Sequence, residues 1–454
     1  MKKTKLIILS LVVVIVSFIF LTNFFIGKNN FKNLKSILNN EQKIFIKRYF
    51  FPYKFISEQQ KVISQLQHLD VKKELKFKKE LKDTMILKNS LLSNGMFLEK
   101  FLLSGGFHYG IWPNTLASGF IDFYNDDIFI LSSSGVLVYT KNIDKSKILK
   151  QIQNNISDYI NLEHFSKSNR NWFSLKDILI EKDKIFISYT EEIQKDCWNT
   201  SIIYGNINYE YIKFEKLYSP KKCIHSFKNI DNEFNAWQSG GKIISFDDNH
   251  VLFSIGDYRN RYLAQDKNSV NGKIIKINIT NGDYKIISIG HRNPQGLYFD
   301  KENNFILETE HGPKGGDEIN KIDIKKINEG ETLNYGWPVV SAGEHYGGKT
   351  INNKRRYEKY PLYKSHSKYG FIEPLKSFVP SIAISEIVKL NNGKYVVASM
   401  KDKSLYFFEI SKDEKITNLE RVEVFERVRD LRLNKNKLYL FLENTGSIGV
   451  INLN

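Results

Sequence analysis

The sequence of 454 residues has only two cysteines and nine prolines, and it is poor in alanine. Two cysteines are too few for a disulfide scaffold, and the spacing of Cys197 and Cys223 matches no zinc-binding motif. In a reducing compartment they would be ordinary small residues, whereas in an oxidising compartment they could close a single loop. The sequence leaves both states open.

The chain also lacks any signature of nucleic-acid recognition, although it is basic. It carries 67 Lys and Arg against 50 Asp and Glu, which gives a net charge of +17. Such a charge attracts nucleic acids, anionic membranes or acidic ligands. However, no helix-turn-helix, zinc knuckle or aromatic RNA-binding motif accompanies it. We therefore expect no nucleic-acid partner, and we attribute much of the lysine excess to solvated faces.

One long hydrophobic run is present, at the N-terminus. Lys2, Lys3 and Lys5 precede an uncharged apolar stretch at residues 6–26, which is long enough for a helix across a hydrocarbon core of about 30 Å. The run has no Ala-x-Ala-like cleavage site, so an uncleaved anchor is favoured over a cleaved signal peptide. The lysines favour a cytoplasmic N-terminus. Residues 1–27 are therefore predicted to be a membrane anchor, with the rest of the chain on the periplasmic or extracytoplasmic side.

The composition and the hydrophobic pattern of the sequence change near residue 105. Residues 28–104 are rich in lysine and nearly free of glycine and proline, and their apolar residues follow mixed helical spacing. This pattern predicts a helical stalk or packing segment without catalytic or ligand-binding residues. From residue 105 onward, short β-rich runs are separated by Asn, Asp, Gly and Lys. We therefore place a second domain at residues 105–454.

A unit made of an alternating strand, a polar turn and a second apolar strand recurs six times in this domain. The six copies begin at Phe120, Asp177, Ile243, Gly296, Glu386 and Asp430. Six such hairpins predict an all-β fold, a six-bladed β-propeller in which each blade is a small antiparallel sheet. An unclosed all-β array is the alternative. In a propeller, binding residues lie at the channel mouth, next to the hairpins.

Three motifs stand out in residues 290–346, namely GHRNPQGL, EHGPKGGDEIN and NYGWP, in this order. Together with SIGD at 254–257 and RVRD at 427–430, they make residues 105–453 resemble the soluble glucose/sorbosone and aldose sugar dehydrogenases. These enzymes use pyrroloquinoline quinone (PQQ) and calcium on a six-bladed propeller. The resemblance implies an oxidoreductase that moves hydride from a sugar C1 hydroxyl to the quinone. Taken singly, each motif is also compatible with a structural turn or packing corner.

The resemblance also implies a set of site residues. PQQ is a flat ortho-quinone with three carboxylates, so its pocket needs fixed cations, and calcium is a hard cation that binds oxygen ligands and polarises the quinone carbonyl. The residues that match cofactor-lining positions are Arg292, Asn293, Tyr346, Lys401, Arg427 and Arg429. The residues that match calcium ligands are Gly312 and Pro313, through their carbonyls, and Glu318 and Tyr335.

Two positions depart from the family pattern. The family's general base is a His shortly before a Gly-Gly-Arg or Ser-Gly-Arg element, and here FNAWQSGGK places Gln238 at that position. An amide does not accept a proton near neutral pH. Trp172 stands where relatives commonly carry a Gln before Gly-Gly-Leu-Leu-Gly, whereas Asp257, whose counterpart supports the base, is retained. Gln238 and Asp257 are therefore the catalytic positions that the resemblance implies.

Another histidine could replace the missing base, although a lone His is more often structural. The candidates are His108, His225, His291, His311 and His345. Two functions remain open. The first is a membrane-anchored, PQQ- and calcium-dependent aldose dehydrogenase acting on a small-molecule sugar. The second is the same propeller with a decayed site that binds a sugar or another anionic ligand without turnover. The motifs specify neither the sugar nor the oligomeric state.

Overall fold

The computed structural model of the protein describes residues 84–103, 107, 118–133, 135–159 and 172–453. All of them belong to one compact unit, His68–Asn454, and none to the other unit, Met1–Gln67. The predicted membrane anchor at 1–27 and the predicted helical residues 28–83 lie outside the described residues, so both stay predictions. Among the residues that are described, no helix has the length and apolar character needed to cross a membrane.

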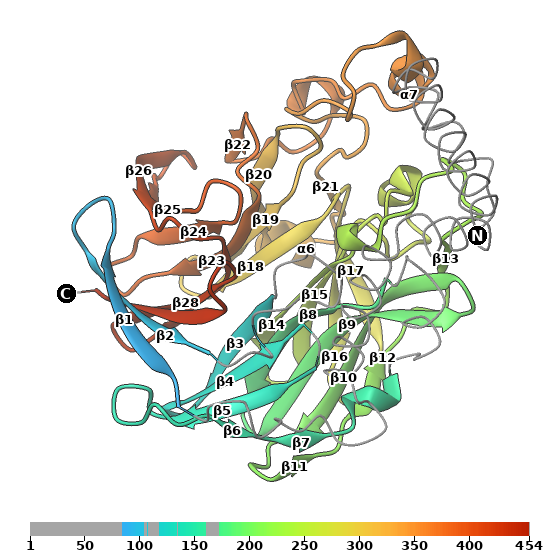
Figure 1. Ribbon diagram of the computed structural model, residues 1–454. Coiled ribbons are helices and arrows are strands. Elements are labelled where there is room, and N and C mark those ends of the chain that lie inside the picture. The colour runs from blue at the N-terminus through green and yellow to red at the C-terminus, as the bar shows by residue number, and fades with distance from the viewer. Residues whose placement is uncertain (1–83, 104–106, 108–117, 134, 160–171, 454) are drawn as a thin grey trace, which may run out of the picture. The chain divides into compact units, whose positions relative to one another are not determined.

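Six mainly antiparallel sheets follow one another along the chain, and each opens with one of the six predicted hairpins (Figure 1). The first strand of each sheet contacts the first strands of its two neighbours, in the cyclic order β3, β8, β14, β18, β23, β27 and back to β3. This closed ring confirms the six-bladed β-propeller, so the alternative of an unclosed array is wrong. We number the sheets as blades 1 to 6 in this order and call their first strands the inner strands.

The first three blades occupy the middle of the chain. Blade 1 contains β3 (Gly119–Tyr124), β4 (Asp127–Ser132), β5 (Leu137–Lys141) and β6 (Lys150–Gln151). Blade 2 contains β8 (Leu175–Glu181), β9 (Lys184–Gln194), β10 (Cys197–Asn206), β12 (Glu215–Tyr218) and β13 (Ile224–His225). Blade 3 contains β14 (Gly240–Asp247), β15 (His250–Ile255), β16 (Lys273–Asn278), β17 (Tyr284–Ile289) and β21 (Leu333–Asn334).

The last three blades complete the ring. Blade 4 contains β18 (Pro294–Asp300), β19 (Phe305–Glu310), β20 (Asp317–Asp323) and β22 (Lys376–Phe378). Blade 5 contains β23 (Ile384–Lys389), β24 (Tyr395–Ser399), β25 (Ser404–Ile410) and β26 (Ile416–Glu423). Blade 6 contains β27 (Val428–Asn434), β28 (Lys437–Leu442), β29 (Ser447–Asn452), β2 (Phe97–Leu102) and β1 (Ile86–Leu91).

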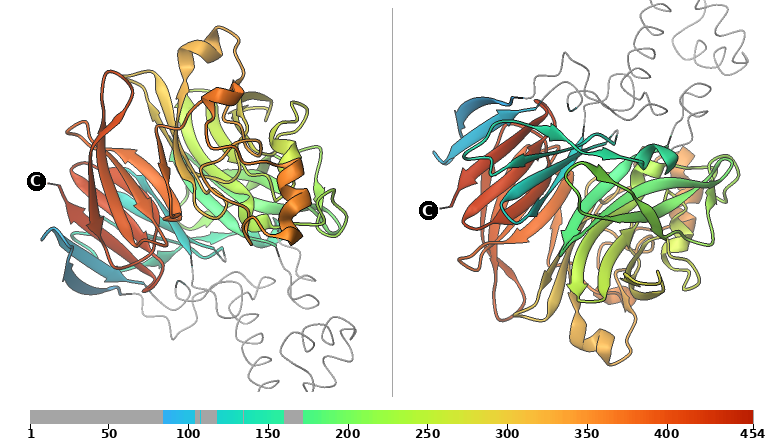
Figure 2. Two further views of the ribbon diagram at one scale, coloured as in Figure 1. Left: turned by 90° about the horizontal axis from the view of Figure 1, so that it is seen from above. Right: turned by 90° about the horizontal axis from the view of Figure 1, so that it is seen from below.

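Short elements lie between and beside the blades. The strands β7 (Gln153–Asn154) and β11 (Tyr211–Ile212) pair in parallel, and the short helices are η2 (Ile156–Tyr159), η3 (Ala236–Gln238), η4 (Arg261–Ala264), α6 (Ile324–Asn328), η5 (Ile351–Asn353), α7 (Lys354–Lys359) and η6 (Ser367–Tyr369). The helix α7 lies beside the segment that leads into η3, because Lys359 and Tyr360 both bind Asp231 (Figure 2).

The helical segment predicted for residues 28–104 is wrong over residues 84–103, which form β1 and β2. Figure 2 shows these blue strands against the red C-terminal blade, where β2 pairs with β29. Leu98 and Phe101 are three residues apart, a spacing that also fits a helix, and both are buried. In the strand they face opposite sides, so Leu98 joins the core between blades 5 and 6 and Phe101 the core between blades 6 and 1. The propeller therefore begins at β1, before residue 105.

Each of the six interfaces between neighbouring blades has its own hydrophobic core. Alternation along each strand sends successive apolar side chains to opposite faces, so one blade contributes to two cores. In blade 2, Ile185 and Ile187 pack toward blade 1, whereas Phe186 packs toward blade 3. The burial pattern of the predicted hairpins is thus the pattern that a stacked, radial arrangement of sheets requires.

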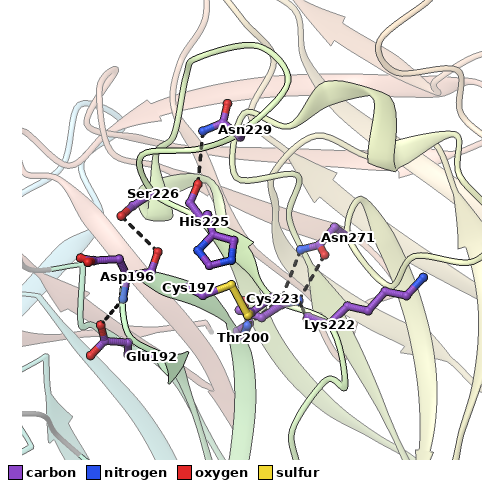
Figure 3. Close-up of a disulfide and its surroundings, with 11 residues drawn as sticks. Glu192, Asp196, Cys197, Thr200, Lys222, Cys223, His225, Ser226, Asn229 and Asn271 are labelled. Carbon is purple, nitrogen blue, oxygen red and sulfur yellow. Dashed lines mark hydrogen bonds between the residues drawn. A yellow bond between two sulfur atoms is a disulfide. The ribbon is translucent and has the colours of Figure 1, made fainter.

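Cys197 and Cys223 form a disulfide, which settles the state that the sequence left open (Figure 3). Their Cα atoms lie 5.3 Å apart. Cys197 is the first residue of β10, and β13, which directly follows Cys223, pairs with the same end of β10. The bond therefore fastens the segment between β12 and β13 to blade 2.

We expect the double variant Cys197→Ser/Cys223→Ser to lose about 3 kcal/mol of unfolding free energy, because the bridge removes loop entropy from the unfolded chain. Guanidinium unfolding of both proteins measures this loss. A reductant should destabilise the wild type to the same extent and leave the variant unchanged. Two free thiols in the unfolded, non-reduced wild type would contradict the bridge.

Leu98→Ala and Phe101→Ala should each lower the unfolding free energy by about 3 kcal/mol, because each leaves a cavity in a different interblade core. Phe97→Ala is the matched control on the same strand, since Phe97 is 64% exposed, and it should change stability by less than about 0.5 kcal/mol. Urea unfolding curves of the three variants test the role of β2. Equal, small effects in all three would show that β2 does not close the ring.

Candidate functional site

Five of the six inner strands change register against their neighbours within their first residues. A bulge of this kind leaves a residue out of the ladder and turns its side chain in a new direction. The residues at these shifts include Lys176, Lys242, Gln295, Glu386 and Arg429. All five line one cavity. The bulges thus gather polar side chains from five blades at the same place.

This cavity has a volume of about 490 Å³. Its lining includes Phe120 and Ser385, so residues from the starts of all six inner strands border it. It is therefore the mouth of the propeller channel, where the fold leads us to expect a ligand site.

Two arginines form a cationic wall of the cavity. Arg427 and Arg429 each donate from Nε to one oxygen of Glu443, at 2.7 and 2.6 Å. Burial disfavours the Glu443 carboxylate, but the two arginines outweigh burial and lower its pKa. The terminal amino groups of Arg429 donate to none of the residues that the structure describes, so they are free for a carboxylate ligand.

Arg292 and Asn293 are not in the cavity lining, but both bind His311, which is. Arg292 donates from Nη1 to the His311 carbonyl at 2.8 Å, and the Asn293 amide nitrogen is 3.2 Å from His311 Nδ1. The Asn293 oxygen accepts from the Gly240 N–H, which fixes the amide with its nitrogen toward His311. His311 Nδ1 therefore accepts, and Nε2 carries the proton of the neutral ring. Burial lowers the pKa of His311 and keeps it neutral.

Gln238 is not part of the cavity lining, although the preceding residue, Trp237, is. It is the last residue of η3 and is 6% exposed, whereas its neighbour Trp237 is 59% exposed and lines the cavity. Trp172 packs edge-to-face against Trp237, with ring centroids 6.0 Å apart. Trp172, one of the two positions that depart from the family pattern, thus forms an aromatic wall with Trp237, the neighbour of the other. Asp257 accepts from Trp337 Nε1 at 2.8 Å, behind Arg292, whose guanidinium lies over the Trp337 ring.

The two other residues expected at the cofactor lie outside the cavity lining. Tyr346 is 52% exposed, and its ring packs under the Arg259 guanidinium at 5.6 Å. Lys401 is exposed and follows Met400, which does line the cavity. Of the six residues that the resemblance implies for the cofactor, the structure therefore places Arg427 and Arg429 in the cavity wall itself.

A buried network of ion pairs supports the cavity. Lys242 binds Asp177 at 3.0 Å and also pairs with Glu386, and Arg432 binds Asp430 at 2.8 Å and Glu386 at 3.1 Å. These residues come from blades 2, 3, 5 and 6. Burial raises the pKa of Glu386 to about 7, although Lys242 and Arg432 oppose this rise. The network holds the bulged strand ends in fixed positions.

A second polar cluster lies in blade 4, where β19 and β20 pair. The cross-strand pairs Glu308 with Asn320 and Glu310 with Glu318 share one face of the hairpin. His291 faces them, with Nδ1 3.4 Å from Glu310 Oε1. Burial raises the pKa values of Glu308 and Glu318 well above their usual range. Among the described residues, Glu308 Oε1 and Asn320 Oδ1 are buried without a hydrogen-bond partner.

This cluster suits a hard cation, because buried carboxylate and amide oxygens with unused lone pairs are calcium ligands. The sequence analysis identified Glu318 and missed Glu308, Glu310 and Asn320. The sequence signal that could have found them is the alternation of polar residues in E-x-E at 308–310 and E-x-N at 318–320, on the two sides of a turn. Tyr335 covers the cluster, since its ring stacks on His291 at 4.8 Å.

Gly312 and Pro313 follow β19 at the cavity side of the same hairpin. The Gly312 N–H donates to Asp317 Oδ1 at 3.1 Å. A Cβ on Gly312 would lie 2.0 Å from the Gly316 carbonyl oxygen, so this position requires glycine. Within the described part of the chain, the Gly312 and Pro313 carbonyls accept no backbone hydrogen bond. Their lone pairs are therefore available to a cation.

Comparison with known proteins identifies sugar dehydrogenases as relatives. The family model described as Glucose / Sorbosone dehydrogenase matches residues 174–450. Aldose sugar dehydrogenase YliI of Escherichia coli (strain K12) is 25% identical over 302 residues, which cover 61% of this chain and 75% of that protein. An uncharacterised Synechocystis protein, slr1608, is 30% identical over 223 residues, which cover 42% of this chain and half of that relative's length, 50%.

Two solved structures share the fold. Soluble aldose sugar dehydrogenase from Escherichia coli in the apo form has a TM-score of 0.57 at 20% identity, and the match covers 73% of this chain and 95% of that chain. The PQQ-bound form of aldose sugar dehydrogenase from Streptomyces coelicolor has a TM-score of 0.55 at 16% identity, and the match covers 82% and 99%. At these identities the likeness establishes the fold.

If the blade 4 cluster binds calcium, Glu308→Gln should have opposite effects with and without the ion. Without calcium the variant should be more stable than the wild type, because it removes a buried carboxylate without a cation partner. With calcium the wild type should gain stability by mass action, and the variant should gain little. Thermal unfolding with calcium or with a chelator measures both effects.

Glu302→Gln is the matched control for this test, since Glu302 lies in the β18–β19 turn of the same blade with its side chain 83% exposed. It should respond to calcium as the wild type does. A Glu308→Gln protein that keeps the full calcium response would show that the cluster is not the binding site.

Proposed function

Because the chain belongs to the glucose/sorbosone dehydrogenase family, we propose that it is a PQQ- and calcium-dependent aldose sugar dehydrogenase. The reaction is hydride transfer from the C1 carbon of a sugar to the quinone. The observation that carries this proposal is the channel-mouth cavity, in which Arg427 and Arg429 are held side by side by Glu443.

The cavity fits a flat tricarboxylate. Its volume of about 490 Å³ lies within the usual range for small-molecule sites, roughly 300–1,000 Å³. Arg427 and Arg429 supply guanidinium groups for carboxylates. When bound, the quinone supplies the electrophilic carbon that receives the hydride. The arginines fix its orientation.

Calcium has two candidate positions. The carbonyls of Gly312 and Pro313 would hold an ion beside the cofactor, where it would polarise a quinone oxygen. The blade 4 cluster around Glu310 and Glu318 would hold a second, structural ion between the sheet hairpin and Tyr335.

The sugar would lie against the aromatic wall. Trp237 presents 59% of its surface and lines the cavity, and Trp172 braces it from the side. Sugar rings have apolar C–H faces that pack on aromatic rings, so Trp237, braced by Trp172, would hold the substrate.

A second candidate function is a binding protein without turnover. It is favoured by Gln238, because this residue occupies the family's base position and has no basic lone pair near neutral pH. The same cationic cavity would then retain an anionic ligand or a sugar.

The proposed location follows from the N-terminal sequence and the disulfide. A membrane anchor at residues 1–27 would place the propeller on the periplasmic or extracytoplasmic side. The bond between Cys197 and Cys223 supports this location, because disulfides persist in oxidising compartments.

Titration of the full protein with PQQ and calcium tests the proposal. We expect saturable binding, followed by loss of the oxidised quinone absorbance when an aldose is added from a panel. Arg429→Met should weaken quinone binding about 10-fold to 100-fold, the value of a lost charge-assisted hydrogen bond. Arg355→Met is the control, since Arg355 is exposed on α7, and it should bind like the wild type.

Each outcome distinguishes the two functions. Binding with bleaching by a sugar supports the dehydrogenase. Binding without bleaching by any aldose favours the binding protein, and absence of quinone binding would overturn the PQQ-dependent function.

A further inference from the structure

Sugar oxidation requires a proton acceptor, because the C1 hydroxyl loses its proton as hydride leaves C1. Gln238 offers none. Among the histidines considered as replacements, His108 lies outside the described residues and His225 is exposed next to the disulfide. His291 lies in the blade 4 cluster, and His345 donates from Nε2 to the Tyr360 carbonyl at 2.8 Å. Neither of these lines the cavity.

His311 lines the cavity but is oriented as a donor. Its Nδ1 accepts from the Asn293 amide, and Asn293 is fixed by the Gly240 N–H. The proton of the neutral ring is therefore on Nε2, which is buried. In this tautomer His311 supplies a hydrogen bond and accepts no proton.

The carboxylates around the cavity are committed to ion pairs. Glu443 accepts from Arg427 and Arg429, and Ser118 donates to it as well. Asp177 and Glu386 pair with Lys242 and Arg432. Asp430 also pairs with Arg432. Each of these carboxylates would have to break an ion pair before it could take a proton.

Lys176 is different, because it lines the cavity without an acidic partner in the described part of the chain. It is the bulged residue of β8, between the ladder pairs Leu175–Tyr189 and Asp177–Ser188. The other titratable or charged groups of the cavity lining are His311, Lys242, Glu386, Asp177, Arg427, Arg429, Asp430 and Glu443. Burial and the charge of Arg429 lower the pKa of Lys176 to about 7.

The stem of Lys176 packs on the element that carries the family's base. A Cβ on Gly241 would lie 2.3 Å from the Lys176 Cβ, and Gly241 has φ +117°, so two separate constraints require glycine there. Gly240 and Gly241 open β14, and only Ser239 separates them from η3, which ends at Gln238. Lys176 thus lines the cavity with its stem against Gly241, three residues after the position from which the family's histidine is missing.

A second buried lysine shows the contrast. Lys273 also has its pKa lowered to about 7 by burial, but its Nζ donates to the carbonyls of Leu263, Ala264 and Asn271. Its hydrogens are used by the fold. Lys176 has no such backbone partners among the described residues, so its nitrogen is available to a ligand.

We infer that Lys176 is the proton acceptor of the proposed dehydrogenase, in place of the family's histidine. Its neutral Nζ takes the proton of the sugar C1 hydroxyl while the hydride on C1 passes to the quinone. The O–H and C1–H bonds break, a C=O bond and an N–H bond form, and the aldose is oxidised to a lactone as the quinone gains two electrons. The inference rests on the proposed function, since it names the base for that reaction.

The state of the amine can be measured without turnover. Competitive acylation of the cofactor-free protein across pH, read by peptide mass spectrometry, gives the titration of each lysine. We expect Lys176 to titrate near pH 7, well below Lys182, which lies in the turn of the same hairpin with its side chain 60% exposed. A Lys176 that titrates together with Lys182 would overturn the inference.

The variant Lys176→Met distinguishes two roles of Lys176, a general base and a cation that binds the cofactor. We expect quinone affinity to stay within about 3-fold of wild type and sugar-dependent reduction to fall by about 10²–10⁴-fold, the usual effect of a lost general base. In the wild type, turnover should fall as pH drops below about 7, because the amine becomes protonated, and the variant should lose this limb. Added methylamine should restore part of the rate. Lys182→Met should match the wild type in every measurement.

Lys176→Arg carries a permanent positive charge and cannot accept a proton near neutral pH. It should be as slow as Lys176→Met, and full activity in this variant would overturn the inference. Weakened quinone binding with unchanged turnover of the loaded Lys176→Met protein would also overturn it, because Lys176 would then be a cofactor cation.

The failure of the proposed function gives a different result. A wild type that binds no quinone, or binds it without oxidising any aldose, overturns the dehydrogenase and the catalytic role of Lys176 together. A wild type that oxidises a sugar, with a Lys176→Met variant of equal rate and pH profile, overturns only the role of Lys176.

Discussion

The ion-pair network around Lys242 and Arg432 is the constraint on which the cavity depends. Two cations and the carboxylates of Asp177, Glu386 and Asp430 hold the starting residues of inner strands from blades 2, 3, 5 and 6. Buried charges are costly unless they are paired, so each strand end has one favourable position. The interblade cores fix the ring as a whole, but this network fixes the residues that line its mouth.

The bulges explain how one face of the propeller becomes a site. A regular inner strand sends alternate side chains into the cores on its two sides, so none of its side chains points into the channel mouth. The register shifts at Lys176, Gln295 and Arg429 release these side chains from that alternation. The site is then divided by charge. Arg427 and Arg429 are compensated by Glu443, whereas Lys176 has no counter-ion among the described residues, and this difference separates a role in anion binding from a role in proton transfer.

Much of the fold could be predicted from the sequence, because the six hairpins show strict alternation and clear turn residues. The strands β1 and β2 could not, since Leu98 and Phe101 are spaced as in a helix and the pairing of β2 with β29 joins distant parts of the chain. Among the site residues, Arg427 and Arg429 follow from the motif RVRD. Glu443 and Lys176 carry no local signal, because the first acts through a neighbouring strand and the second faces the cavity only through its bulge.

A structure of the protein with bound PQQ and calcium tests the central claim most directly, since it locates the cofactor independently of turnover. The account predicts the quinone in the channel-mouth cavity, with its carboxylates on Arg427 and Arg429, an ion at the Gly312 and Pro313 carbonyls, and Lys176 facing the space left for the sugar. A quinone bound elsewhere on the propeller, with this cavity empty, would contradict the account.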